Sequence, residues 1–240
     1  LGALALGYGS DKWGVLHRFT PHYDRHLRRL RADAVRVLEI GVGGYAFMPG
    51  GASLRMWKRY FHRGQIFGID IFDKSVLDEP RITTLVADQN DPRQMHDLAE
   101  RHGPFDVIID DGSHVNRHVR TAFHALYPHL NPGGVYVIED LWTAFCPGFG
   151  GQDTRHPGPG TSLHLVRDLV DSIQYEEHPD GPSAGPDSVA ATTTGLHVYH
   201  NIAFIEKGVN AEGGVPRWVP RDFAALVDID TPPTRWSTTE

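Results

Sequence analysis

The segment Phe105-Asp-Val-Ile-Ile-Asp-Asp-Gly-Ser-His114 joins an apolar run to a polar turn. Its first six residues, preceded by Gly103-Pro104, are typical of an interior strand of a parallel sheet. Parallel strands present functional side chains at their carboxyl ends, and this end carries two carboxylates and an imidazole. A second apolar run, Gly134–Ile138, ends in Glu139-Asp140. If these strands are neighbours, about 5 Å apart, their terminal side chains share one small volume, which favours a metal-assisted active site.

Helical and strand patterns alternate on both sides of this segment. We expect a doubly wound, mostly parallel, seven-stranded α/β sheet with an antiparallel closing pair. Its expected strands are Val35–Ile40, Gln65–Asp70, Ile82–Ala87, Phe105–Asp110, Gly134–Ile138, Leu196–His200 and Ile202–Ile205. The expected helices are Thr20–Leu30, Ala52–Phe61, Pro92–His102, Val115–Tyr127 and Ser162–Tyr175, with a turn at Asn131–Gly134.

The chain divides into three expected parts. Residues 1–34 form a segment and a helix that cover a cofactor site, residues 35–208 form the catalytic domain, and residues 209–240 form a tail. Phe145–Gly160 is rich in glycine and proline, so we expect a mobile loop beside the site.

Composition excludes several classes of protein. The formal charge of −7 argues against nucleic acid or an anionic membrane as the main partner. The single cysteine, Cys146, excludes an internal disulfide framework and suits a cytoplasmic location. No stretch approaches the roughly 20 apolar residues that a membrane span needs.

A glycine-rich loop follows the first expected strand. Gly41-Val-Gly43-Gly-Tyr-Ala matches a dinucleotide-binding pattern, but that pattern requires a helix to begin there and offer its N-terminus to a pyrophosphate. Pro49-Gly50-Gly51 delays the helix to about Ala52, so a ligand without phosphates fits better than NAD. Glu39, at the end of the strand, suits a ligand that carries an amine.

Two further carboxylates end the next strands. Asp70 occupies the position at which an acid accepts two ribose hydroxyls, and Asp88 is placed to accept a hydrogen bond from an adenine amine. A solvated loop acid is the alternative for each. Together with Glu39, Gly41 and Gly43, they outline a site for S-adenosylmethionine.

Several motifs together resemble the macrolide deoxysugar O-methyltransferases of mycinamicin and tylosin biosynthesis and the related rhamnose O-methyltransferases. These motifs are Tyr8-Gly-Ser-Asp-Lys-Trp-Gly14, Leu38-Glu-Ile-Gly-Val-Gly-Gly44, Gly51-Ala-Ser-Leu-Arg-Met-Trp57, Gly68-Ile-Asp-Ile-Phe-Asp-Lys74 and Asp110-Asp-Gly-Ser-His114. The resemblance covers roughly residues 8–210. It implies a class I methyltransferase fold, S-adenosylmethionine converted to S-adenosylhomocysteine, and Mg²⁺.

The resemblance also implies roles for individual residues. Asp111, Glu139 and Asp140 match the metal ligands, and His114 matches the catalytic base. Tyr8 and Lys12 are expected at the cofactor, where Lys12 would meet the methionine carboxylate. Apart from the resemblance, His17, Trp142 and His200 are expected to bind the acceptor, and His197 is a further candidate; a structural role is the alternative for each histidine. Some members assemble through an additional N-terminal domain, and we expect a homo-oligomer here as well.

The expected reaction is methylation of a deoxysugar hydroxyl in antibiotic biosynthesis, on a small glycoside or a nucleotide sugar. Such a hydroxyl has a pKa near that of water, about 16, so a metal and a base together are needed to remove its proton. Three carboxylates suit Mg²⁺. Asp110, inside the strand, is more suited to hydrogen bonds in the core or to the ligand than to binding the metal.

Other functions stay open at this stage. A metal-dependent O-methyltransferase of a catechol-like phenol would use the same ligands, and a non-catalytic module would bind S-adenosylmethionine alone. Asp111 could simply cap the following helix, and Glu139-Asp140 could be a solvated strand end. An iron-dependent hydroxylase is disfavoured because no pair of histidines with one carboxylate is apparent.

Overall fold

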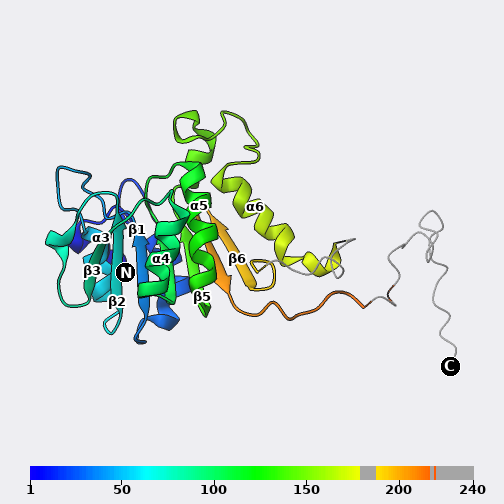
Figure 1. The fold of residues 1–240 in the computed structure, drawn as a ribbon, viewed down its shortest axis with the longest axis horizontal. Coiled ribbons are helices and arrows are strands. Elements are labelled where there is room, and N and C mark those ends of the chain that lie inside the picture. Colours follow the sequence, from blue (N-terminus) through cyan, green and yellow to red (C-terminus); the bar gives the residue numbers. More distant parts are fainter. Residues whose placement is uncertain (179–187, 217–218, 220–240) are drawn as a thin grey trace, which may run out of the picture.

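The computed structural model describes residues 1–178, 188–216 and 219. Their strands form one seven-stranded sheet in the order β3-β2-β1-β4-β5-β7-β6 (Figure 1). The strands are β1 (Arg36–Ile40), β2 (Gln65–Asp70), β3 (Ile82–Val86), β4 (Phe105–Asp110), β5 (Leu130–Ile138), β6 (Thr193–Tyr199) and β7 (Ile202–Lys207). Neighbours from β3 to β5 are parallel, whereas β7 is antiparallel to both β5 and β6. The expected fold class, including the closing pair, is confirmed.

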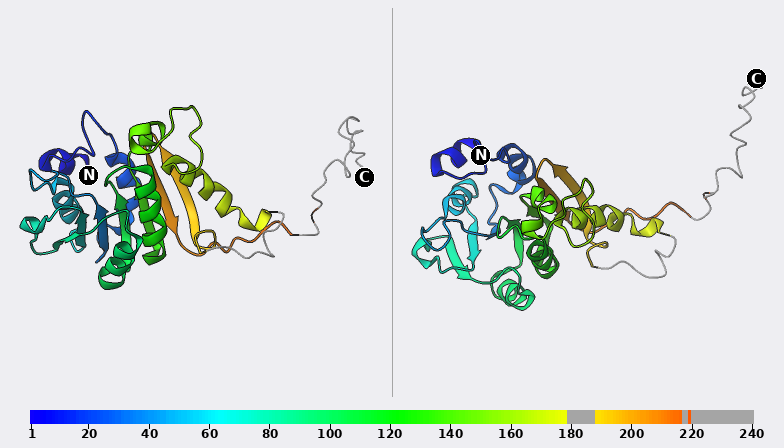
Figure 2. Two further views of the ribbon diagram at one scale, coloured as in Figure 1. Left: turned by 45° about the horizontal axis from the view of Figure 1, so that its top comes forward. Right: turned by 90° about the horizontal axis from the view of Figure 1, so that it is seen from above.

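Helices cover both faces of the sheet (Figure 2). The α-helices are α1 (Gly2–Tyr8), α2 (Thr20–Leu27), α3 (Ala52–Tyr60), α4 (Pro92–His102), α5 (Asn116–Leu126) and α6 (Ser162–Ile173). Short 3-10 helices are η1 (Arg28–Leu30), η2 (Ser75–Leu77), η3 (Tyr127–His129), η4 (Leu141–Phe145), η5 (Pro147–Phe149) and η6 (Tyr175–Glu177). One apolar cluster packs under α4, α5 and α6, and a second packs under α1, α2 and α3. None of the described helices is long and apolar enough to cross a membrane.

The alternation of side chains along the strands decides which face each strand-end acid meets. In β1, Leu38 and Ile40 belong to the cluster under α4–α6, and Val37 belongs to the cluster under α1–α3. Glu39 therefore points with Val37 toward α1–α3. Glu139 extends β5 in the same sense, beyond Val137. Both acids are buried, and both need a partner on that face.

One local expectation was wrong, and one helix was not foreseen. Asn131–Gly134 is part of β5 and not a turn before it. Phe105 pairs with Leu130 and Val107 pairs with Val135, so the pairing of β4 and β5 is irregular between these positions, and Asn131–Gly134 lie within that irregularity. Residues 1–34 contain α1 in addition to α2. Helix α1 is stabilised by burial of Ala5 against the sheet cluster and ends at Gly9 in the left-handed conformation.

Smaller differences concern the ends of elements and the tail. The expected helix Ser162–Tyr175 ends at Ile173, and the closing strands are longer than expected. Phe145–Gly160 contains η5 and is otherwise irregular; its mobility stays a prediction. Most of the expected tail, 209–240, lies outside the described residues.

Candidate active site at the carboxyl edge of the sheet

A cavity of about 620 Å³ opens at the carboxyl ends of β1, β2 and β4. The glycine-rich loop after β1 forms one wall. Its shape depends on Gly41, at φ +88°, where a Cβ would lie 2.2 Å from the carbonyl oxygen of Asp111. Only glycine allows this approach. At Gly43, with φ +73°, an added Cβ would meet no atom within 4 Å, so this glycine borders open space.

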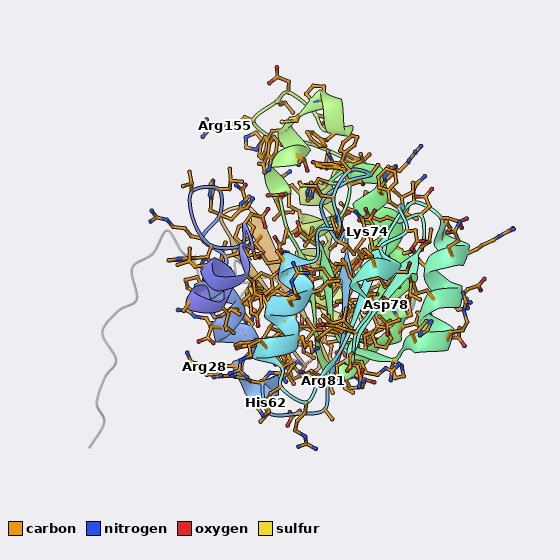
Figure 3. The ribbon with its side chains drawn as sticks, turned by 90° about the vertical axis from the view of Figure 1, so that its left-hand side faces the viewer. Arg28, His62, Lys74, Asp78, Arg81 and Arg155 are labelled. Atoms are coloured by element: carbon orange, nitrogen blue, oxygen red, sulfur yellow. The ribbon has the colours of Figure 1, made fainter. Side chains whose placement is uncertain are left out.

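Two side chains hold this loop in place. The Val42 amide donates to Asp70 Oδ2 at 3.1 Å. The buried ammonium of Lys74 donates to the carbonyl oxygens of Tyr45 and Met48, the latter at 3.0 Å. In Figure 3, Lys74 lies at mid-height, between Arg155 at the top of the view and Arg81 and His62 lower down. As expected, the helix after the loop begins at Ala52, with Gly51 as its N-cap.

The residues expected at the cofactor separate into two groups. Gly41, Gly43, Asp70 and Asp88 line the cavity, together with Ser10 and Asp11 from the segment after α1. Tyr8, Lys12 and Glu39 are not among its lining residues. The roles of both groups remain predictions. In the second group, Lys12 and Glu39 are buried and form an ion pair with each other, whereas Tyr8 is 38% exposed.

Glu39 is fully buried, and its carboxylate is surrounded by donors from the chain. Oε2 accepts from Ser53 Oγ at 2.7 Å, and Oε1 accepts from Trp57 Nε1 at 3.1 Å. Lys12 Nζ lies 3.3 Å from Oε1. Burial raises the pKa of Glu39, and the nearby ammonium of Lys12 opposes that rise. The amine that Glu39 meets in this structure is therefore that of Lys12.

Lys12 is a buried cation inside a ring of carboxylates. Its Nζ lies 2.6 Å from Asp111 Oδ2 and 2.7 Å from Glu139 Oε1. Burial alone would lower the pKa of Lys12, but attraction to Asp111, Glu139 and Glu39 outweighs burial and holds it well above the ordinary value. The ammonium points toward the strand-end acids, and its expected contact with a methionine carboxylate stays a prediction.

Glu139 is held by two groups that the sequence did not indicate as partners. Besides Lys12, the hydroxyl of Tyr23 on α2 donates to Glu139 Oε1. Burial and the nearby Glu139 carboxylate raise the pKa of Tyr23, so this hydroxyl stays a donor. The apolar pattern of α2 predicted that Tyr23 is buried, but nothing in the pattern indicated what its hydroxyl meets.

Asp111, His114 and Asp140 bring one ligand atom each to within 4.8 Å of one another. His114 Nε2 lies 3.4 Å from Asp140 Oδ2 and 4.0 Å from Asp111 Oδ1. Both His114 and Asp140 have a positive φ, 55° and 54°, which is uncommon for residues with a side chain and is concentrated at functional sites. The two neighbouring strands thus place these acids and the imidazole together, as expected.

Asp140 has an unusual environment. Its Oδ1 is buried and accepts no hydrogen bond within the described part of the chain. His17 Nε2, 3.6 Å away, is its neighbour on one side. Burial raises the pKa of Asp140, and repulsion by Asp111 adds to that rise while the two histidines oppose it. A buried carboxylate oxygen without a donor is stabilised by a cation.

The donor set fits a hard divalent cation. Carboxylate oxygens are the ligands that Mg²⁺ prefers, with remaining positions taken by water or substrate. Around Lys12 the cluster holds four acids against one ammonium: Glu39, Asp111, Glu139 and Asp140. A divalent ion would offset much of this excess negative charge. Asp111 and Asp140 lie with His114 in one group, whereas Glu139 faces Lys12 and Tyr23; the place of Glu139 among the ligands stays a prediction.

The residues expected to bind the acceptor lie around this cluster. His17 contacts Asp140. Trp142 is 41% exposed on η4 and packs edge-on against Phe149. His200 is exposed in the turn between β6 and β7, which is tied to η4 by the hydrogen bond from the Leu141 amide to the Asn201 carbonyl. Their acceptor contacts remain predictions.

Asp110 lies beneath the cavity and does not belong to the cation cluster. Its Oδ1 accepts a hydrogen bond from Gln89 Nε2 at 2.6 Å, which confirms that it bonds within the core, and its Oδ2 is buried without a partner among the described residues. Burial raises the pKa of Asp110 from 3.8 to about 7.

This shift predicts a pH dependence of stability. Because the folded protein holds the Asp110 proton more tightly than the unfolded chain, the contribution is fully present below about pH 4 and is lost as the pH rises to about 7. Three pH units correspond to roughly 4 kcal/mol. We expect Asp110→Asn to lose less stability than the wild type between pH 5 and 8, measured by urea unfolding in EDTA. Parallel pH profiles would contradict the assignment.

Comparison with known proteins agrees with this geometry. Residues 38–141 match a family model described as a methyltransferase domain. The chain is 61% identical over 228 residues to a demethylmacrocin O-methyltransferase of Streptomyces fradiae, covering 95% of this chain and 58% of that protein. It is 58% identical over 232 residues to a mycinamicin VI 2''-O-methyltransferase of Micromonospora griseorubida, covering 96% and 58%.

A solved structure is similar over nearly the whole chain. It is the MycE methyltransferase from the mycinamycin biosynthetic pathway in complex with Mg, SAH and mycinamycin VI, with a TM-score of 0.90 and 57% identity. The match covers 96% of this chain and 59% of that chain. The chain therefore spans a little under three fifths of the length of these relatives.

Proposed function

We propose that the chain is one of the O-methyltransferases that modify the sugars of macrolide and polyketide glycosides, and that it methylates a deoxysugar hydroxyl of a glycosylated natural product. Its 51–61% identity to three such enzymes supports this proposal. The methyl donor is S-adenosylmethionine, the product is S-adenosylhomocysteine, and the reaction requires Mg²⁺. One observation carries the proposal: Asp111 and His114 line the cavity, and Asp140 joins them at its edge.

The glycine loop and the acids around it form the proposed cofactor site. Gly41 and Gly43 let the backbone approach the ligand, and Asp70 is placed to accept from the ribose hydroxyls while its Oδ2 holds the loop. Asp88 lies on the same wall, with its Oδ1 accepting from the Asn90 amide. Glu39 and Lys12 contribute indirectly, because their ion pair joins the loop side of the site to Asp111.

The proposed chemistry needs a deprotonated hydroxyl in line with the methyl group. Mg²⁺, when bound, lowers the pKa of a hydroxyl that it contacts. Asp111 and Asp140 would hold the ion, and His114 Nε2, 3.4 Å from Asp140 Oδ2, is placed to take the proton. Lys12 and Tyr23 keep Glu139 and Asp111 oriented. The leaving thioether is neutral, so no acid is required.

The test is transfer of labelled methyl groups from S-adenosylmethionine to a panel of deoxysugar macrolides, nucleotide sugars and catechols, with and without Mg²⁺. We expect methylation of a glycoside only with Mg²⁺. Methylation of catechols alone would contradict the sugar assignment. Binding of the cofactor by calorimetry, with transfer to no acceptor in the panel, would favour a non-catalytic module.

Three properties remain predictions from the sequence: a cytoplasmic location, a homo-oligomeric assembly, and the absence of nucleic-acid or membrane partners. The division into a covering segment (1–34), a catalytic domain (35–208) and a tail (209–240) is likewise proposed. Ser10 and Asp11 in the wall of the cavity support a covering role for the first part.

A further inference from the structure

Three metal-ligating side chains meet on the α2 side of the β6–β7 hairpin, apart from the residues that line the cavity. They are His26 from α2, His197 from β6 and Glu206 from β7, and their ligand atoms lie within 4.8 Å of one another. His26 Nδ1 and His197 Nε2 are each 3.5 Å from the same carboxylate oxygen, Glu206 Oε1. Two imidazoles and a carboxylate thus converge on one point.

The backbone holds these groups rigidly. In the β6–β7 register, His197 pairs with Phe204 and Gly195 pairs with Glu206, so His197 and Glu206 are diagonal neighbours on one face. Phe204 stacks on the His26 ring with centroids 4.5 Å apart. A Cβ at Gly195 would lie 3.2 Å from Glu206 Oε2 and 3.5 Å from His197 Nε2. Glycine at this position leaves room beside the ligand atoms.

His26 is oriented as a metal-binding histidine usually is. It is buried, with 7% of its surface exposed, and its Nε2 lies 3.0 Å from the hydroxyl of Tyr199. An imidazole that binds a metal through one nitrogen typically uses the other for such a hydrogen bond. With Nε2–H donating to Tyr199, the lone pair on Nδ1 faces the Glu206 carboxylate, an arrangement that a cation between them would stabilise.

The electrostatics favour a neutral ligand at His26. Burial lowers the pKa of His26, and the neighbouring His197 lowers it further, while Glu206 opposes both. A neutral imidazole is the form that binds metal ions. The carboxylate of Glu206 is about one third exposed, which gives an ion from solution a path to the cluster.

We propose that His26, His197 and Glu206 bind Zn²⁺, or a similar borderline transition-metal ion. Two nitrogens and one carboxylate oxygen with an open fourth position match a zinc coordination set, whereas Mg²⁺ prefers oxygen ligands alone. The statement from the sequence that no pair of histidines with one carboxylate is apparent was therefore wrong, because these residues are far apart in the chain and meet only in the fold. None of the three lines the cavity at the glycine-rich loop, so the set does not support an iron-dependent hydroxylase at that cavity. The site shares no ligand with the cluster at Asp111, and its proposal does not rest on the proposed methyl transfer.

A second cluster, His96, Glu100 and His129, provides a comparison. Its His96 Nδ1 and His129 Nε2 are hydrogen-bonded to each other at 3.0 Å, and the Glu100 side chain is 62% exposed. A ligand nitrogen engaged with the other ligand is less available to an ion. This cluster therefore serves as the internal control.

Zinc at the proposed site would connect α2 to the edge of the sheet. Helix α2 also carries Tyr23, whose hydroxyl reaches Glu139, and Phe204 contacts both the Tyr23 and His26 rings. Zinc would thus hold the helix that presents Tyr23 to the acidic cluster. We expect Zn²⁺ to raise the melting temperature of the full chain.

The experiment is titration of the full chain with Zn²⁺ by calorimetry in excess Mg²⁺, which competes for the oxygen ligands near Asp111. His197→Gln and Glu206→Gln are the test variants, because both side chains are partly exposed and the changes preserve their approximate size. His129→Gln is the control. Circular dichroism without metal checks that each variant folds as the wild type does.

We expect one equivalent of Zn²⁺ to bind the wild type and the control with equal affinity, and the dissociation constant to rise at least about 10-fold in both test variants. Tyr199→Phe should weaken binding by roughly 10-fold, since it removes the partner of Nε2. Equal affinity in the wild type and both test variants, loss of binding in the control alone, or no binding by the wild type would each overturn the proposal.

Discussion

Chelation with EDTA is expected to abolish methyl transfer, and Mg²⁺ is expected to restore it. A sugar hydroxyl has a pKa of about 16, and lowering it to about 7, as a bound metal does for water, corresponds to roughly 12 kcal/mol. An imidazole with a pKa of about 6.5 cannot supply this alone. Labelled-methyl assays with an active glycoside, at several concentrations of chelator and Mg²⁺, measure the effect. Full activity in chelator would exclude a metal role.

Variants locate the ion. Asp140→Asn keeps the size of the side chain but removes its negative charge, including that on the buried Oδ1, which accepts no hydrogen bond from the described residues. We expect it to raise the Mg²⁺ concentration needed for half-maximal activity and to lower the turnover number by roughly 10³-fold, which corresponds to several kcal/mol. Asp168→Asn, at an exposed acid on α6, is the matched control and should leave both values unchanged. A normal metal requirement in Asp140→Asn would remove this acid from the site.

The sheet could be predicted from the sequence because its central strands are buried on both faces. Gln65–Asp70 and Phe105–Asp110 are found with the expected bounds, since an apolar run between turn residues has few alternatives to an interior strand. Because Asp111 and Asp140 follow two of the expected parallel strands, the same assignment predicted that both lie at the carboxyl edge of the sheet. Once the strand order is known, Ile40, Asp110 and Ile138 stand side by side, and the residues after them meet.

The ion pairs of Lys12 could not be predicted, because this residue comes from a segment without periodicity. Lys12 lies in a turn-rich segment about one hundred residues before Asp111 in the chain, and only the folded chain shows that its ammonium meets three carboxylates. From the sequence, the positive charge of Lys12 suggested only that it binds an anionic ligand group. The alternation of side chains along a strand shows which face of the sheet Glu39 and Glu139 point to. This alternation would have indicated an ion pair only together with the knowledge that a lysine is buried on the same face.

Replacing the expected base, His114→Ala, should reduce turnover by roughly 10²- to 10⁴-fold, the usual contribution of a positioned general base. Cofactor affinity should change little, because the glycine loop is held by Asp70 and Lys74. Steady-state kinetics and calorimetry with S-adenosylhomocysteine separate the two effects. His118 also lines the cavity but hydrogen-bonds Ser113, so His118→Ala should act on cofactor binding and leave the chemical step nearly intact.

His17 is the rival base, because its Nε2 lies 3.6 Å from the other oxygen of Asp140. It stacks on Phe19, with ring centroids 4.5 Å apart, and is absent from the lining of the cavity. His114 lines that cavity, where the methyl group is expected to be delivered. Loss of turnover should therefore be much larger in His114→Ala than in His17→Ala, which should mainly raise KM for the acceptor. The reverse order would transfer the role of base to His17 and leave His114 as a positioning residue for Asp140.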